Sequence, residues 1–170
     1  MINLLKITIL IFVSFFFINS SFSNENTGFV NIDYILQNSN IGKKLLEDIN
    51  NKDEENIENL RKKNKFLKEL ELSIIAKKNI ISTEAYNKEV EDFKKKFAEF
   101  SSEKNQIVNE FNNFKKNELE NFFKKISPTI NDYMKENSIK ILFDSKNIFI
   151  GAQELNFTED VLKKINKELK

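Results

Sequence analysis

The chain has 170 residues, with 27 basic and 26 acidic side chains, three glycines, one proline, and neither cysteine nor histidine. The balanced charge argues against general nucleic-acid binding, which usually shows a basic excess. The lack of cysteine and histidine excludes disulfides and removes the usual zinc ligands, general bases and reactive thiol. We therefore expect no enzyme, no metal site and no cofactor.

The N-terminal segment is typical of a secretory signal. Lys6 precedes an almost unbroken apolar run over 7–18, and small residues at Ser21 and Ser23 have the spacing of a cleavage site. The run is shorter than the roughly 20 apolar residues of a membrane-spanning helix. We expect residues 1–23 to be removed, which leaves 26 charges of each sign. The alternative is an uncleaved N-terminal anchor.

A short strand is predicted over 28–33, because Val30 and Ile32 alternate onto one face. Asp33 is the expected cap of the helical turn that follows it. Ser39 is the expected cap of the long helix that comes next.

That long helix is predicted from about Gly42 to Ala76, with a heptad pattern of apolar residues. Asp53, Asn56 and Lys63 interrupt the pattern, so the seam has polar gaps in its middle.

A second helix is predicted to begin after Ser82, a good N-cap, with Glu84 in its first turn. Its apolar steps of four and three are more regular, and Lys104 is the one polar intrusion. The seam predicted for the two helices comprises Leu60, Leu67, Leu70, Ile74, Tyr86, Val90, Phe93, Phe97, Phe100, Ile107, Phe111 and Phe114.

Only a few residues join these helices, so they must fold back on each other. An arm of about 35 residues, at ~1.5 Å per residue, would project roughly 50 Å. We place its tip near 77–83. The alternative is a compact helical bundle.

Pro128 falls where the second helix should still run. Either Ser127 caps a renewed helix with Pro128 in its first turn, or the helix kinks there. Asn137, a residue that tolerates the left-handed conformation, is the predicted end.

Two more strands are predicted over 139–143 and 148–150, and a final helix begins at Thr158. Three short strands from both ends of the chain would form a small sheet with exposed edges and a thin core, which assembly with further copies would cover. The expected assembly residues are Val30, Ile32, Ile141, Phe143, Ile148 and Ile150.

The order of these parts resembles the Skp/OmpH family of periplasmic chaperones. The resemblance is carried by residues 29–37 with 42–44, by 81–85 at the arm tip, and by 141–144 with 157–163 and Asn166. It implies an α+β fold, mainly α, in which residues 24–41 and 119–170 form a trimerising β body and 42–118 form a helical hairpin arm.

The resemblance further implies a periplasmic homotrimer that holds unfolded outer-membrane proteins between its arms. No glycine-rich phosphate loop is present, which agrees with a chaperone that uses no ATP. The alternative function is a membrane-anchored coiled-coil spacer or adaptor of the cell envelope.

Family members are often strongly basic, whereas this chain is neutral, so basic character is expected to be local. Residues 61–78 hold seven basic side chains against two acidic ones, and 47–58 hold one against six. Either this is an unevenly charged solvated surface, or the basic tip contacts acidic client segments or anionic lipid head groups. The basic residues are Arg61, Lys62, Lys63, Lys65, Lys68, Lys77 and Lys78.

Overall fold

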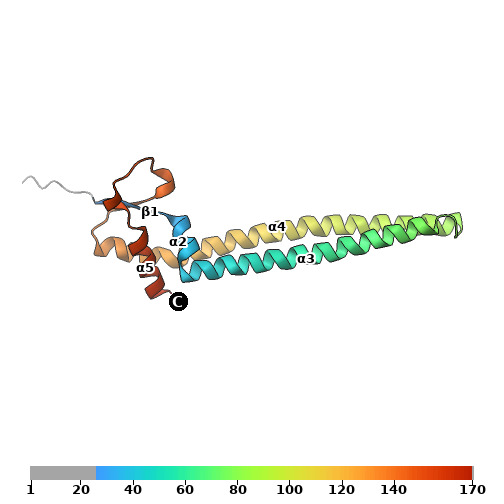
Figure 1. The fold of residues 1–170 in the computed structure, drawn as a ribbon, viewed down its shortest axis with the longest axis horizontal. Helices are drawn as coiled ribbons and strands as arrows, with labels where there is room; N and C mark the ends of the chain where they lie inside the picture. Colours follow the sequence, from blue (N-terminus) through green and yellow to red (C-terminus); the bar gives the residue numbers. More distant parts are fainter. Residues whose placement is uncertain (1–25, 170) are drawn as a thin grey trace, which may run out of the picture.

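The computed structural model describes residues 26–169, and the signal predicted over 1–23 lies outside them. The chain forms a small body from which one long helical hairpin projects (Figure 1). The fold is therefore α+β and mainly α, as predicted. Across 26–169, no helix combines the length and apolar character needed to cross a membrane.

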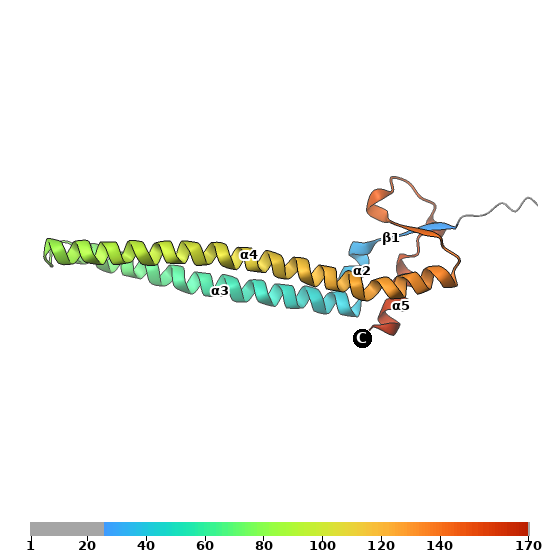
Figure 2. The same ribbon diagram turned by 180° about the vertical axis from the view of Figure 1, so that it is seen from behind.

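The hairpin consists of α3 (Asn40–Lys77) and α4 (Thr83–Glu136), which lie side by side along its length (Figures 1 and 2). The Ser39 hydroxyl accepts a hydrogen bond from the Gly42 N–H (3.1 Å), and the Ser82 hydroxyl accepts one from the Ala85 N–H (3.2 Å). Both predicted N-caps are thus correct, because each satisfies a backbone donor that has no partner within its helix. The 38 residues of α3 span about 57 Å at ~1.5 Å per residue.

Helix α4 continues through Pro128 into the body. The Ser127 hydroxyl donates to the Phe123 carbonyl (2.6 Å), so it does not cap a renewed helix. Burial of Ile126 before Pro128 and of Tyr133 after it, both in the body core, holds the helix in place. The helix ends at Glu136 with Asn137 as its C-cap, close to the predicted end, but the left-handed residue is Ser138, with φ of 56°.

The N-terminal strand is shorter than predicted. Strand β1 covers Thr27–Val30, and Ile32 already belongs to α2 (Ile32–Asn38). The expected cap Asp33 is wrong: the Asn31 side chain accepts the hydrogen bond from the Tyr34 N–H (2.9 Å). Asp33 instead forms an ion pair with Lys146 (2.6 Å).

The third predicted strand is absent from the described part of the chain. Strand β2 (Ile141–Asp144) pairs with β1 in parallel, Thr27 opposite Ile141, and the sheet has these two strands. The Asp144 carboxylate accepts a hydrogen bond from the Lys146 N–H (3.2 Å), which turns the chain into the 3-10 helix η1 (Ser145–Asn147). Residues 148–150 therefore leave the sheet instead of pairing with it.

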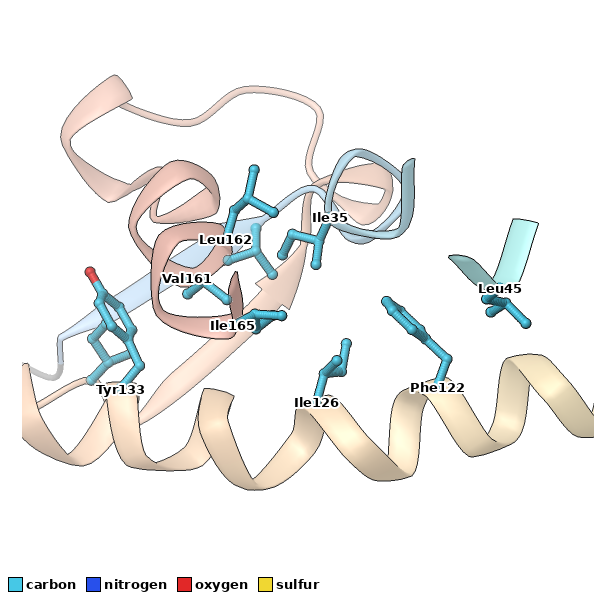
Figure 3. Packing of buried hydrophobic residues seen from close by; sticks show 10 residues of the cluster. Ile35, Leu45, Phe122, Ile126, Tyr133, Val161, Leu162 and Ile165 are labelled. Carbon is cyan, nitrogen blue, oxygen red and sulfur yellow. The ribbon is translucent and has the colours of Figure 1, made fainter. Parts of the chain in front are cut away.

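The hydrophobic core lies where the body helices cross the root of the arm. Helix α5 (Thr158–Glu168) places Val161 and Ile165 against Ile35 of α2 and Ile126 of α4, as Figure 3 shows. A second 3-10 helix, η2 (Gln153–Leu155), precedes it. The residues of this cluster come from the root of the arm or from the body, and in the distal arm Leu67 and Ile74 are buried between the two helices.

Candidate functional site

The arm is closed by one apolar seam between α3 and α4. On α3, Leu67 and Ile74 are buried, and Leu60 and Leu70 are half-buried. The structure brings these residues against a half-buried line on α4, which comprises Tyr86, Val90, Phe93, Phe100, Ile107, Phe111 and Phe114. Of the predicted seam residues, only Phe97 is exposed (51%), although its ring lies 6.2 Å from that of Phe93.

The polar residue in the α4 seam is not the predicted one. Lys104 is exposed, whereas Glu103 is half-buried and forms an ion pair with Lys63 of α3. Nearer the tip, Lys77 pairs with Glu89 in the same way (3.0 Å). In an antiparallel pair of helices, the residue numbers of facing positions have a constant sum, and both ion pairs share it. The sequence signal that identifies Glu103 is therefore an acidic residue at the position that faces Lys63.

The seven predicted basic residues divide into two groups. Four form ion pairs within the arm: Lys62 with Glu58, Lys63 with Glu103, Lys65 with Glu69, and Lys77 with Glu89. Across residues 26–169, the other three, Arg61, Lys68 and Lys78, form no ion pair. Of the seven predicted basic side chains, these three are therefore the ones available to pair with a partner.

The distal arm as a whole has a smaller basic excess than residues 61–78 alone. Including the facing part of α4, residues 61–104 hold twelve basic and eight acidic side chains, an excess of four. At physiological ionic strength the Debye length is about 8 Å, so this excess acts at close range.

The seam is open near the tip, where Ile74, Tyr86, Val90 and Phe93 line a groove of about 280 Å³ with Glu71, Ile75 and Lys94 around them. Exposed apolar residues continue along the distal arm at Phe66, Leu72, Ile75, Ile80 and Phe97. Apart from Phe97, these residues fall outside the heptad register and were not predicted. Apolar residues out of register on a charged helix are the sequence signal that identifies them.

The predicted assembly residues of the body fall into two sets. Val30 is buried within one chain, and Ile32 and Ile148 are half-buried, whereas Ile141, Phe143 and Ile150 are exposed. Phe149 is exposed almost completely (99%). Beside them is a groove of about 360 Å³ lined by Phe29, Phe143, Ile148, Ile150 and Leu155 with Thr27, Gly28, Asn147 and Gly151. We call the exposed apolar residues of the sheet and of the loop after it, with this groove, the body face; they are Ile141, Phe143, Phe149, Ile150 and Leu155.

Charged contacts fix α5 to α4. Lys164 pairs with Glu136 (2.9 Å) and Glu168 (3.0 Å), and the Thr129 hydroxyl donates to Glu168 (3.0 Å). The hydrogen bonds from Lys164 and Thr129 lower the pKa of Glu168, and those to Glu136 and Glu168 raise the pKa of Lys164. Thr129 is buried and Lys164 half-buried, so these groups join α5 to α4, which indicates a structural role.

Comparison with known proteins agrees with this architecture. Residues 26–165 match the family described as outer membrane protein (OmpH-like). A crystal structure from Caulobacter crescentus CB15, described as that of a candidate outer membrane chaperone (OmpH-like), superimposes with a TM-score of 0.79. That match covers 85% of this chain and 86% of the other at 13% identity, so it shows a shared fold. Among curated proteins, no significant match is found. Because the family match extends over most of its length, this chain belongs to the OmpH-like family.

Proposed function

We propose that this chain is a periplasmic holding chaperone that binds unfolded outer-membrane proteins and prevents their aggregation without ATP. The observation that carries the proposal is the exposed apolar surface of an arm that projects beyond the core of the body. Leu72, Ile75, Ile80 and Phe97 remain exposed along the distal arm. Apolar surface of this kind marks interaction sites in soluble proteins. Membership in the OmpH-like family supports the same role.

The proposed active form is a homotrimer joined through the body face. Ile141, Phe143, Phe149 and Ile150 would be covered by neighbouring chains, which removes both the exposed sheet edge and the apolar surface. Three arms would then surround one cavity. An unfolded client would make many weak contacts there, each small against the entropy lost if the client chain became ordered.

Polar positions in the seam would let each arm bend around clients of different size. Asp53 and Asn56 are half-buried between α3 and α4, and Lys63 is held by Glu103. Apolar packing is therefore thinnest in the middle of the arm.

The proposal includes export with removal of residues 1–23. N-terminal sequencing of the protein recovered from the periplasm should begin at Asn24. A chain that still begins at Met1 and stays with the membrane would contradict export in this form.

The direct test dilutes a denatured outer-membrane β-barrel protein into buffer with the chain from Asn24 onward and no nucleotide, while light scattering is recorded. Stoichiometric trimer should suppress the scattering. The variant L72S/I75S/F97S should stay trimeric and lose most of the suppression, because its arm has lost exposed apolar surface. The matched control changes exposed polar residues of the arm, N51S/N59S/N109S, and should behave as wild type. Undiminished scattering with the wild-type trimer would refute the holding function.

A further inference from the structure

A line of four charged residues runs along the outer surface of α3. Glu47, Glu54, Arg61 and Lys68 are spaced seven residues apart and are all exposed, so they lie on one face of the helix. We call them the charge stripe. The sequence of signs along it is acidic, acidic, basic, basic.

The charge stripe is unpaired within the chain, unlike much of the charge around it. Lys52 pairs with Glu55, Lys62 with Glu58, and Lys65 with Glu69 along the same helix. Glu58 and Lys65 lie next to the stripe, three or four residues from its members, but each is paired with a residue outside the stripe. Over residues 26–169, none of the four charge-stripe residues takes part in an ion pair or a side-chain hydrogen bond.

An apolar residue lies at the middle of the stripe. Ile57 is 57% exposed and is three residues from Glu54 and four from Arg61, so it lies next to both on the helix surface. An acidic half, a central apolar side chain and a basic half follow one another along the arm.

This pattern is complementary to itself when two copies lie antiparallel. With a twofold axis beside Ile57, Glu47 of one arm faces Lys68 of the other, and Glu54 faces Arg61. Twofold symmetry repeats both pairs, which gives four ion pairs around two facing Ile57 side chains. We propose that the charge stripe is an interface on which a second copy of this chain docks its own arm in the opposite direction.

The direction of the contact determines which molecules can make it. Arms that leave one shared body run parallel, so equivalent residues face each other and like charges oppose. The antiparallel contact therefore joins arms of separate assemblies, with the tip of each arm next to the root of the other. It is an interaction between assemblies, distinct from the proposed trimer and from client binding.

Charge reversal gives a two-sided test. The variant E47K/E54K has a wholly basic stripe, and R61E/K68E has a wholly acidic one. Sedimentation velocity at low salt should show association of wild-type assemblies that added salt weakens. Each variant alone should associate about tenfold more weakly or worse, as expected for four exposed ion pairs. An equimolar mixture of the two variants should associate again, because all four facing pairs are then complementary.

The quadruple variant E47K/E54K/R61E/K68E restores the pattern in reverse and should associate as wild type does. Absence of salt-sensitive association in the wild type, or a mixture no stronger than its components, would overturn the proposal. Binding of an acidic or basic client peptide to the stripe without association between assemblies would overturn it as well, since the partner would then be of a different kind.

Disulfide trapping tests the register, because the chain has no cysteine of its own. Mixed Glu47→Cys and Lys68→Cys chains should form the crossed 47–68 disulfide on mild oxidation. The matched control replaces the neighbouring exposed residue, Asp48→Cys, and should give much less crossed product with Lys68→Cys. A predominance of 47–47 and 68–68 disulfides would show parallel arms and reject the antiparallel contact.

Discussion

Close packing at single positions limits which residues the root of the arm accepts. Gly42 is buried at the start of α3, and a Cβ there would lie 2.0 Å from the Leu36 carbonyl oxygen and 2.7 Å from the Ser39 hydroxyl. In an ordinary helix, replacing glycine by alanine gains roughly 0.5–1 kcal/mol. Here α2 packs so close to Gly42 that replacement by alanine should lower the stability instead of raising it.

We expect Gly42→Ala to lower the free energy of unfolding by about 1–3 kcal/mol, the usual range for overpacking. Chemical denaturation followed by circular dichroism measures the change. Asn51→Ala, at an exposed position of the same helix, is the control and should be nearly neutral or slightly stabilising. Stabilisation by Gly42→Ala would show that α2 does not pack against this site.

The Glu168 cluster gives a pH dependence. Hydrogen bonds from Lys164 and Thr129 lower the pKa of Glu168 below its ordinary value of 4.5. The unfolded chain therefore binds this proton more readily than the folded one, and stability is lost as the pH falls below 4.5 through the folded pKa. The melting temperature of Glu168→Gln should fall less between pH 6 and pH 3 than that of the wild type. Glu154→Gln, at an exposed carboxylate, is the control, and equal slopes for all three proteins would contradict the assignment.

At the scale of elements, the seam determines how stiff the arm is. Asn56 occupies a half-buried heptad position where an apolar residue would normally pack. We expect Asn56→Leu to stabilise the arm by roughly 1 kcal/mol, because a partly buried leucine contributes at least part of its transfer free energy.

Hydrogen exchange should show slower opening of α3 and α4 amides in Asn56→Leu, with body amides unchanged. Asn59→Leu, three residues away at an exposed position, should leave the exchange rates as they are. Equal protection in the two variants would mean that Asn56 does not limit arm stability. A stiffer arm should also protect a narrower range of client sizes in the scattering assay.

Across the whole molecule, the body face determines the oligomeric state that we propose. Phe143 and Ile150 are exposed on it, whereas Ile80 is as apolar and also exposed but lies at the arm tip. Native mass spectrometry should find a trimer for the wild type and for Ile80→Asp, and monomers for F143D/I150D, because buried unpaired carboxylates oppose assembly. A trimer that survives F143D/I150D would place the interface elsewhere.

Local sequence patterns predicted the arm well. The heptad spacing from Leu60 to Phe114, the caps Ser39 and Ser82, and the short connection between the helices depend on neighbours in sequence, so they can be seen without the fold. One helix alone could not predict that Glu103, and not Lys104, is the polar residue in the α4 seam. This depends on which side chain faces Lys63 across the hairpin.

The sequence by itself determined a mostly helical chain with a doubled-back arm, because helix period, capping and hinge position are local properties. Only the tertiary structure decided that β1 pairs in parallel with β2, more than a hundred residues later, and that 148–150 leave the sheet. A strand of three or four residues is too short to specify its own partner. Its pairing depends on where α2, α4 and α5 bring the two ends of the chain together around one core.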